Sequence, residues 1–267
     1  HLRLAYTPST VTVAQRERIQ ELLPEALLVG GDDLVKELGW VKEKSELENI
    51  RKAVEISDTA FERILQLVRP GVRERDLAAE LEYQMTMLGS ERPAFETIVA
   101  SGYRSAMPHG LAGKKKIAKG DFVTFDFGAT VNGYVSDITR TVVVGKATAR
   151  QKKIYGVVLR AQKAGIRKVR SGIAARAVDQ AARGVIERAG YGKHFGHGTG
   201  HGIGFIVHTG PRVAPRSDDK LKVNNVITVE PGIYIDGWGG VRIEDDVLVT
   251  RNGGKVLNRA PKNLLEL

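Results

Sequence analysis

Residues 122–143, FVTFDFGATVNGYVSDITRTVV, contain two β-rich runs on either side of Asn132-Gly133. Asn-Gly between two such runs is typical of a tight β-hairpin. If the residues that flank this turn pair with each other, position 126 lies opposite 139, and Asp126 and Asp137 become diagonal neighbours on one face. Two carboxylates among apolar side chains repel each other and resist desolvation unless a cation lies between them. The hairpin therefore predicts a cation site.

The same pattern recurs in residues 227–249, ITVEPGIYIDGWGGVRIEDDVLV. If position 235 pairs with 241, Glu230 and Glu244 also become diagonal neighbours on one face. Their offsets from the first acidic pair are 104 and 107 residues. Pro231 within the first run favours a bulge, which leaves this register open. Two matched hairpins predict a shared metal site made of four acids.

The segments around the hairpins also repeat, because a helix pair punctuated by Gly71 and Gly89 recurs with Gly172 and Gly190, 101 residues later. Apolar residues at helical spacing predict helices over 45–68, with Ser45 as the cap, and over 74–88, 148–170 and 176–189. Strands are expected near 94–100, 122–131, 134–144, 203–208, 226–235 and 241–250. This order predicts an α+β fold with two pseudo-symmetric halves, each with two helices and antiparallel strands, which share a curved sheet.

Residues 1–40 differ from the rest of the chain. The pattern predicts a strand over 2–6, a helix over 12–23, and a strand over 27–31 that enters a Gly-Gly-Asp-Asp turn at 30–33. Because this is too little to fold alone, we interpret 1–40 as the remnant of an N-terminal domain or as a linker, and 41–267 as the main domain.

The composition of the 267 residues gives a formal net charge of +10, which raises the question of a nucleic-acid partner. The basic residues are spread along the predicted helices, and no basic-aromatic surface for base stacking is visible, so we expect a solvated surface and no nucleic acid.

No apolar run has the roughly 18 residues of a membrane span, so no membrane partner is expected. The chain has no Cys and shows no leader, which suits the cytoplasm and restricts metal ligands to His and carboxylates.

Four of the six histidines lie in residues 194–208, HFGHGTGHGIGFIVH. The spacing of His197 and His201 would indicate zinc on a helix, but the interleaved glycines disfavour a helix and instead allow the backbone to approach a site closely. A phosphate-binding loop is the rival interpretation, although the Gly-Lys-Ser/Thr signature is absent. His109 lies at the end of a strand-like region. One or two His with four carboxylates favours Mn²⁺, and less strongly Co²⁺ or Zn²⁺, in a pair of ions suited to hydrolysis.

Five motifs in this order resemble the pita-bread metallopeptidases, a family that includes methionine aminopeptidase, aminopeptidase P, Xaa-Pro dipeptidase (prolidase) and creatinase. The similarity spans roughly residues 42–250, which implies that 41–267 form a pita-bread catalytic domain. The motifs are DFG (126–128), SDITRT (136–141), GHGTGHGIG (196–204), VEPGIY (229–234) and VRIED (241–245).

The resemblance implies a role for each matching residue. Asp126 would bind one metal and His201 the other, Asp137 and Glu244 would bridge them, and Glu230 would bind beside His201 while it shuttles a proton. His109 and His208 would stabilise the tetrahedral intermediate, His197 would line the substrate pocket, and Arg242 would support the site. Arg212 would bind the C-terminal carboxylate of the substrate.

Within the family, SGYRSAMPHG (101–110) and GVRIEDD (240–246) resemble the proline-specific branch. The resemblance therefore implies an Xaa-Pro dipeptidase with two divalent ions, a proline-containing peptide as substrate, and a homodimer. Thr209 departs from the branch, whose members often have an acid after the histidine at 208. Two alternatives stay open: an aminopeptidase P that acts on longer Xaa-Pro-Yaa peptides, and a non-catalytic binding protein of the same fold.

Overall fold

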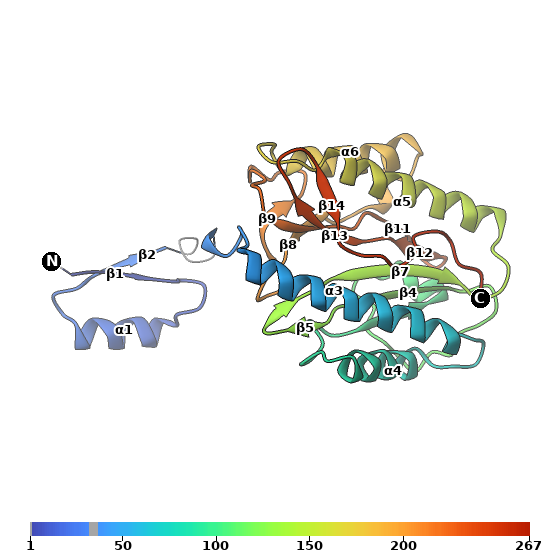
Figure 1. The fold of residues 1–267 in the computed structure, drawn as a ribbon, viewed down its shortest axis with the longest axis horizontal. Coiled ribbons are helices and arrows are strands. Elements are labelled where there is room, and N and C mark those ends of the chain that lie inside the picture. The colour runs from blue at the N-terminus through green and yellow to red at the C-terminus, as the bar shows by residue number, and fades with distance from the viewer. Residues whose placement is uncertain (1, 32–36) are drawn as a thin grey trace.

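A computed structural model describes residues 2–31 and 37–267, and in it the strands form a central layer between two pairs of helices (Figure 1). The first pair is α3 (Lys44–Ile64) and α4 (Glu74–Met87), and the second is α5 (Ala149–Lys168) and α6 (Arg176–Arg188). Two-helix units on either side of the strands confirm the predicted repeat.

The glycines that end these helices adopt the same conformation in both halves. Gly71 and Gly172 have φ values of +92° and +86°, and Gly89 and Gly190 have +102° and +84°. These angles lie where a side chain is disfavoured, so glycine is required at each corner. The predicted Ser45 cap is wrong. Helix α3 begins one residue earlier, and its N-cap is Glu43, whose backbone N–H donates to the Glu46 carboxylate at 2.7 Å.

Both long strands of the first hairpin are interrupted beside an acid. The strands of this half are β3 (Ile98–Ser101), β4 (Phe122–Phe127), β5 (Thr130–Val131), β6 (Tyr134–Val135) and β7 (Ile138–Val143). The predicted register is confirmed, because Val131 pairs with Tyr134 and Asp126 with Thr139. At the interruption a Cβ added to Gly128 would lie 1.9 Å from the backbone oxygen of Ser136, so the two chains meet where only glycine fits.

The second hairpin is built in the same way, but its predicted register is wrong by two residues. Ile235 pairs with Gly239 rather than with position 241, because Gly237 and Gly239, at φ +67° and +146°, close a three-residue loop. Glu230 and Glu244 then lie directly opposite each other instead of diagonally. The strands of this half are β8 (Gly200–Gly202), β9 (Thr209–Val213), β10 (Val226–Val229), β11 (Gly232–Ile235), β12 (Gly239–Arg242), β13 (Asp245–Val249) and β14 (Gly254–Val256).

The strand predicted over 203–208 is also wrong. Gly202 pairs with Thr209, so the residues between them must reverse the direction of the chain and form bends. The apolar residues of this run serve other purposes than a strand, because Ile203 is buried in the core, Phe205 packs on Tyr134, and Ile206 and Val207 line a cavity.

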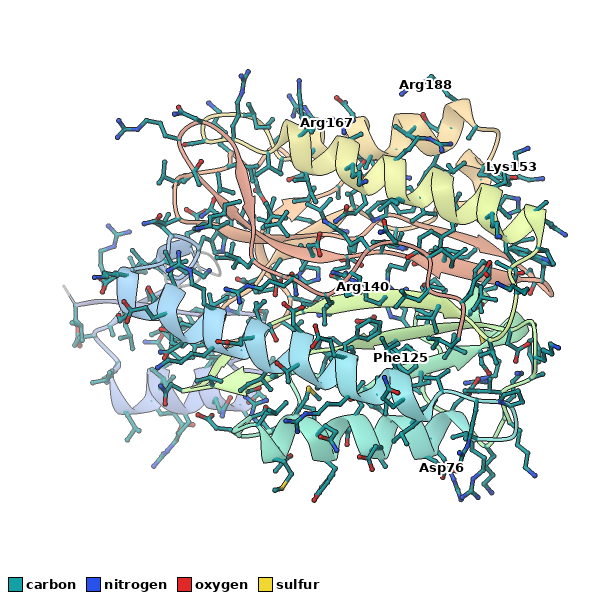
Figure 2. The ribbon with its side chains drawn as sticks, turned by 45° about the vertical axis from the view of Figure 1, so that its right-hand side comes forward. Asp76, Phe125, Arg140, Lys153, Arg167 and Arg188 are labelled. Carbon is teal, nitrogen blue, oxygen red and sulfur yellow. The ribbon has the colours of Figure 1, made fainter. Side chains whose placement is uncertain are left out.

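The two halves meet along β7 and β12–β13. The strand order is β3-β4-β7 in the first half and β14-β13-β10-β8-β9 in the second. The Glu244 N–H donates to the Thr139 carbonyl at 3.1 Å, and the Thr141 hydroxyl donates to the Arg242 carbonyl at 3.0 Å. These bonds join the ladders into the shared layer that the repeat predicts. Figure 2 shows Arg140 in the middle of this layer, whereas Lys153, Arg167 and Arg188 project from the outer helices.

Each helix pair buries its apolar face on the strand layer, and the start of α3 also packs on strands of the second half. In the first half, Phe61 of α3 meets Phe125 of β4 edge to face, with ring centroids 6.1 Å apart. In the second half, Ile154 and Ile186 pack with Ile233 and Val241. Burial of these side chains is the main force that holds the helices on the strand layer.

The N-terminal segment lies beyond the start of α3 in Figure 1. Strands β1 (Arg3–Tyr6) and β2 (Leu27–Gly30) pair in parallel, with α1 (Val13–Leu22) between them, which confirms the predicted strand, helix and strand. Part of the predicted turn at 30–33 lies outside the described residues. Over 2–31 and 37–267, no helix combines the length and the apolar character that crossing a membrane requires.

Candidate metal centre

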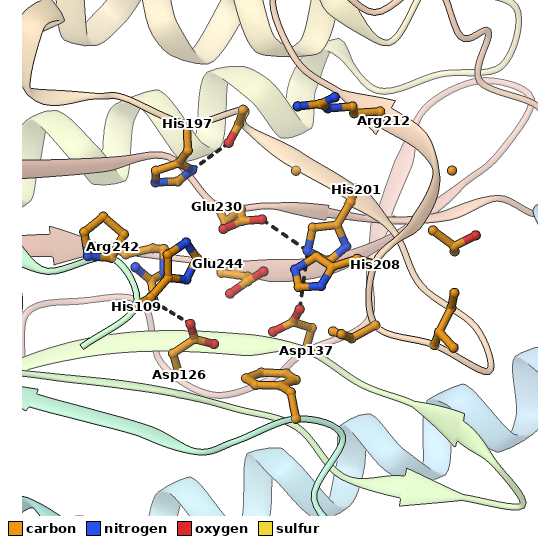
Figure 3. A pocket seen from close by; sticks show the side chains of 18 of the residues that line it. His109, Asp126, Asp137, His197, His201, His208, Arg212, Glu230, Arg242 and Glu244 are labelled. Atoms are coloured by element: carbon orange, nitrogen blue, oxygen red, sulfur yellow. Dashed lines mark hydrogen bonds and ion pairs between the residues drawn. The ribbon is translucent and has the colours of Figure 1, made fainter. Parts of the chain in front are cut away.

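A cavity of about 940 Å³ lies where the two hairpins and the glycine-rich segment meet (Figure 3). All ten predicted site residues line it: His109, Asp126, Asp137, His197, His201, His208, Arg212, Glu230, Arg242 and Glu244. Residues more than 130 positions apart in the chain are therefore brought to one place by the pairing of the two halves.

Asp137, His201 and Glu244 converge most closely, because each offers one ligand atom and these atoms all lie within 4.8 Å of one another. Asp137 precedes β7, His201 lies on β8, and Glu244 lies in the interruption between β12 and β13. An interrupted strand lets its side chain leave the alternating pattern, which explains how acids from two hairpins reach one point.

His201 connects this group to Glu230. Its Nε2 lies 3.3 Å from Oε1 of Glu230 and 3.6 Å from Oδ2 of Asp137. Its Nδ1 lies 3.1 Å from the carbonyl oxygen of Gly202, to which it donates. A backbone acceptor on one ring nitrogen that leaves the other facing carboxylates is the arrangement found at histidine metal ligands.

Asp126 lies in the same cavity but differs from the other acids, because it accepts a hydrogen bond from the Arg242 guanidinium. Arg242 also donates to the hydroxyl of Tyr234 at 2.8 Å and to that of Thr139 at 3.0 Å. Three fixed contacts on a buried guanidinium hold the Asp126 carboxylate toward the cavity. The supporting role of Arg242 stays a prediction, for which these contacts give a geometric basis.

The carboxylates are electrostatically unfavourable in the absence of a cation. Burial, followed by the charge of Glu244, holds the pKa of Asp137 well above its usual range. Burial, followed by Glu230, does the same for the pKa of Glu244. Burial also acts to raise the pKa of Glu230, but the hydrogen bond and charge of His201 outweigh it, so that pKa is lowered. Only one of these three acids is stabilised in its charged form by the protein itself.

The donor set fits a divalent cation. Oε1 of Glu244 is buried and accepts no hydrogen bond from any residue in the described ranges, although Oε2 accepts one from Thr139 at 2.6 Å. A buried carboxylate oxygen without a donor is costly unless a cation takes that place. Carboxylate oxygens with one imidazole suit a hard or borderline ion.

His197 belongs to a hydrogen-bonded chain that the sequence did not indicate. Arg242 donates to the Tyr234 hydroxyl, which donates to Nε2 of His197 at 2.8 Å, and Nδ1 of His197 donates to the Gly198 carbonyl at 2.8 Å. Burial lowers the pKa of His197, which keeps the ring neutral. With the observed register, Tyr234 shares a face with Arg242, so the alternation of side chains along β11 could have identified Tyr234 as a site residue.

Two further residues were missed. Thr139 lies opposite Asp126 and donates to Glu244, and the correct register of the first hairpin already placed it on that face. Asp246 accepts a hydrogen bond from the Asp137 backbone at 2.9 Å, and burial holds its pKa well above the usual range. No pattern in the sequence distinguishes Asp246 from its neighbour Asp245.

The outer wall of the cavity holds the residues expected to contact substrate. The His208 ring lies 4.4 Å from that of His201, and burial, followed by the charge of His201, lowers its pKa. Thr209 and Arg212 lie on β9, where the Arg212 backbone N–H donates to Asp219 at 2.7 Å and its side chain is exposed. Figure 3 shows Arg212 apart from the acids, although it lines the same cavity.

Comparison with known proteins gives consistent matches. The model of metallopeptidase family M24 matches residues 48–251. The chain is 49% identical over 234 residues to the Xaa-Pro dipeptidase of Pyrococcus furiosus, which covers 88% of this chain and 67% of that protein. A solved Xaa-Pro dipeptidase from Bacillus anthracis aligns at 45% identity with a TM-score of 0.98, over 100% of this chain and 75% of that one.

A solved X-Pro aminopeptidase from Thermotoga maritima aligns at 41% identity with a TM-score of 0.96, over 100% of this chain and 75% of that one. The agreement with these structures confirms the predicted fold class. The family match covers both hairpins, the histidine-rich segment and the cavity between them. The chain therefore belongs to metallopeptidase family M24.

Proposed function

We propose that this chain is a prolidase-like peptidase that hydrolyses Xaa-Pro dipeptides with two divalent metal ions, preferentially Mn²⁺. The observation that supports it best is the convergence of Asp137, His201 and Glu244 in a cavity that Arg212 also lines. Relatives named Xaa-Pro dipeptidase, at 49% and 47% identity, add to this support. The excess of carboxylate over imidazole donors favours Mn²⁺ over a tetrahedral zinc site.

The five ligands would be Asp126, Asp137, His201, Glu230 and Glu244. Bound cations would supply Lewis acidity, which acidifies water and polarises a peptide carbonyl. The protein itself supplies the proton acceptor, because the lowered pKa of Glu230 keeps its carboxylate ionised at neutral pH. Nε2 of His201 lies 3.3 Å from this carboxylate, close enough for one cation to contact both side chains.

His109 and His208 would donate hydrogen bonds to the carbonyl oxygen of the scissile bond. Both line the cavity, and the lowered pKa of His208 keeps its ring neutral, with one N–H available. Apolar side chains surround this place and suit a proline ring, which has no N–H to satisfy. They are Phe95, Ile98, Pro108, Leu111, Ile206 and Val207.

Arg212 would bind the C-terminal carboxylate and so select dipeptides. The purified Mn²⁺-loaded protein should cleave Ala-Pro, and Arg212→Ala should lower kcat/KM for Ala-Pro about 10- to 100-fold, as expected for a charged hydrogen bond. The loss on Ala-Pro-Ala should be smaller, because its terminal carboxylate lies one residue further on. Arg216→Ala, at an exposed arginine just after β9, is the matched control.

Three results of these measurements would contradict the proposal. Equal losses on both peptides would refute the role of Arg212 in binding the carboxylate. Cleavage of Met-Ala-Ala without cleavage of any Xaa-Pro peptide would refute the assignment to proline. A protein that binds no metal and cuts no peptide would instead be the non-catalytic binding protein.

An aminopeptidase that acts on Xaa-Pro-Yaa peptides is the second candidate. The likeness to the Thermotoga maritima X-Pro aminopeptidase favours it, as does a cavity of about 940 Å³, which leaves room beyond a dipeptide. A kcat/KM higher on Ala-Pro-Ala than on Ala-Pro would establish it.

We also propose that residues 41–267 form the catalytic unit and that 1–40 belong to a linker or a neighbouring domain. The family match at 48–251 lies within the first range, and β1 and β2 pair only with each other among the described strands. The homodimer and the cytoplasmic location stay predictions.

A further inference from the structure

The first part of the loop that bears His109 is bonded to the body through Ser105, whose hydroxyl accepts a hydrogen bond from the Gly240 N–H at 2.8 Å, but in the described structure the part around His109 has few hydrogen bonds. The loop follows β3, begins with the 3-10 turn Gly102–Ala106, and returns to the body of the protein near Gly113. The His109 side chain is exposed to the cavity, and the bonds near it are two short backbone turns, at Gly110 and Leu111. Such a loop does not fix the position of a side chain at its tip by itself.

A single buried carboxylate closes the base of this loop. Glu74, the first residue of α4, has no exposed surface. Its Oε1 accepts hydrogen bonds from both the backbone N–H and the hydroxyl of Ser101, each at 2.8 Å. Its Oε2 accepts one from the Gly113 N–H at 3.0 Å and one from Nε of Arg104 at 2.9 Å. Both ends of the loop are therefore held on one side chain.

Arg104 extends this contact into the loop. While Nε binds Glu74, its guanidinium also donates to the carbonyl oxygen of Leu111, two residues after His109. A Cβ added to Gly113 would lie 3.2 Å from Oε2 of Glu74 and 3.5 Å from Cζ of Arg104, so the chain passes close to the pair. The side of the loop beyond His109 is thus tied to its base.

We propose that Glu74 and Arg104 are positioning residues for His109, which set where its ring lies over the scissile carbonyl. This inference rests on the proposed function and adds two residues to that site. Net stability is a poor explanation for the pair, because a buried carboxylate with a partly buried arginine gains little over apolar side chains of similar size. The geometry of the Glu74–Arg104 pair instead fixes one conformation of the loop.

The second half uses the same device. Asp179 of α6 is fully buried and accepts hydrogen bonds from Arg183 at 2.9 and 3.0 Å, and from the hydroxyl of Thr199 at 2.8 Å. Arg183 also donates to the carbonyls of Phe195 and His197, at 2.9 and 2.6 Å. In each half, an acid on the second helix and an arginine hold a loop that bears a cavity histidine.

A double-mutant cycle tests the proposal. Arg104→Met and Arg104→Lys are made in the native chain and in a His109→Ala chain, and kcat and KM on Ala-Pro are measured with Mn²⁺. In the native chain, we expect Arg104→Met to lower kcat about 10- to 100-fold with little change in KM, as for a displaced catalytic group. In the His109→Ala chain, the same change should cost less than about threefold, because the group being positioned is gone.

Arg73→Met is the matched control, since Arg73 caps the start of α4 and forms an exposed ion pair with Asp76 at 2.7 Å, and it should change neither constant. If Arg104→Met folds poorly, Arg104→Lys takes its place in the cycle. Lysine keeps a positive charge beside the Glu74 carboxylate but loses the hydrogen bond to the Leu111 carbonyl. Equal fold losses in the two backgrounds would overturn the proposal, as would a loss that follows the metal content.

Hydrogen–deuterium exchange gives a readout independent of the substrate. In Arg104→Met, the amides of 107–113 should exchange about tenfold faster or more, while those of α4 and β4 stay unchanged. Faster exchange with no cleavage of Xaa-Pro peptides would leave the positioning role standing and refute the proposed function. Unchanged exchange in this loop would refute the positioning role.

Discussion

At the scale of single residues, the candidate acidic ligands lie so close together that they need a positive charge, which they do not supply themselves. Asp137 and Glu244 have raised pKa values because burial and neighbouring carboxylates disfavour their ionised forms. A divalent cation would reverse this, because it favours the ionised forms and takes the buried oxygen of Glu244. The same side chains thus destabilise the metal-free protein and would be stabilised by a bound cation.

Because burial and neighbouring carboxylates disfavour ionised Asp137, we expect Asp137→Asn to have opposite effects with and without metal. The affinity of the variant for Mn²⁺ should be about 100-fold or more lower than that of the native protein, as measured by calorimetry. In chelator, the variant should unfold at a higher temperature than the native protein. Because the folded-state pKa of Asp137 lies above the unfolded one, the folded protein holds more protons between them, and its free energy of unfolding falls as the pH rises through that window.

The difference between variant and native protein in chelator should therefore be larger at pH 7.5 than at pH 4.5. Asp76→Asn is the control, because Asp76 is exposed in an ion pair on α4 and lies away from the centre. A variant that is less stable than the native protein in chelator at pH 7.5 would show that burial and neighbouring carboxylates do not disfavour the ionised form of Asp137.

At the scale of elements, the site depends on strands that stop where a regular pattern would continue. Alternation predicted the runs 122–131 and 134–144 as unbroken strands, and the structure divides each beside an acid. Helix ends were predictable because Gly71, Gly89 and their counterparts have a local conformational reason to be glycine. The second register was not, because it depends on the φ angles of Gly237 and Gly239, which composition alone does not fix.

The candidate site was more predictable than the strand lengths, because nine of its ten residues belong to sequence motifs in the two hairpins or in the segments that face them, and only Arg212 lies outside them. What the sequence could not give are the partners supplied by tertiary packing. The strand registers could place Tyr234 and Thr139 on the faces of the site, but not the atoms that they contact. Nothing in the sequence indicated Glu74, because its partners come from distant segments.

The interruption of β4 gives a prediction for Gly128→Ala. Its Cβ would lie 1.9 Å from the Ser136 backbone oxygen, so the hairpin must open beside both acids. We expect a loss of about 2–4 kcal/mol in the free energy of unfolding and weaker metal binding, measured by urea denaturation and calorimetry. Gly156→Ala is the matched control, because Gly156 lies within α5 with only the Arg160 side chain near, at 3.4 Å. It should gain about 0.5–1 kcal/mol, and equal losses in the two variants would contradict the argument.

At the scale of the whole molecule, the two halves are held together behind the site by Arg140. This arginine of β7 is 1% exposed and pairs with Asp245 of β13 at 2.7 Å. Its guanidinium also donates to the backbone oxygens of Thr139, Glu244, Ala260 and Pro261. One side chain thus links the first half, the second half and the C-terminal segment, directly beside a candidate metal ligand.

Arg140→Met should therefore destabilise the protein by about 3–5 kcal/mol, because it leaves a buried carboxylate and four carbonyl oxygens short of a donor. Lys262 and Gln162 also contact Asp245, and their remaining bonds favour the lower end of that range. Lys152→Met, which removes an exposed ion pair with Glu266 at 3.0 Å, should cost less than about 1 kcal/mol. Urea denaturation in chelator measures both changes without a contribution from metal binding. A loss below about 1 kcal/mol for Arg140→Met would mean that the apolar packing within each half, rather than this arginine, holds the two hairpins at the distance that a shared metal site requires.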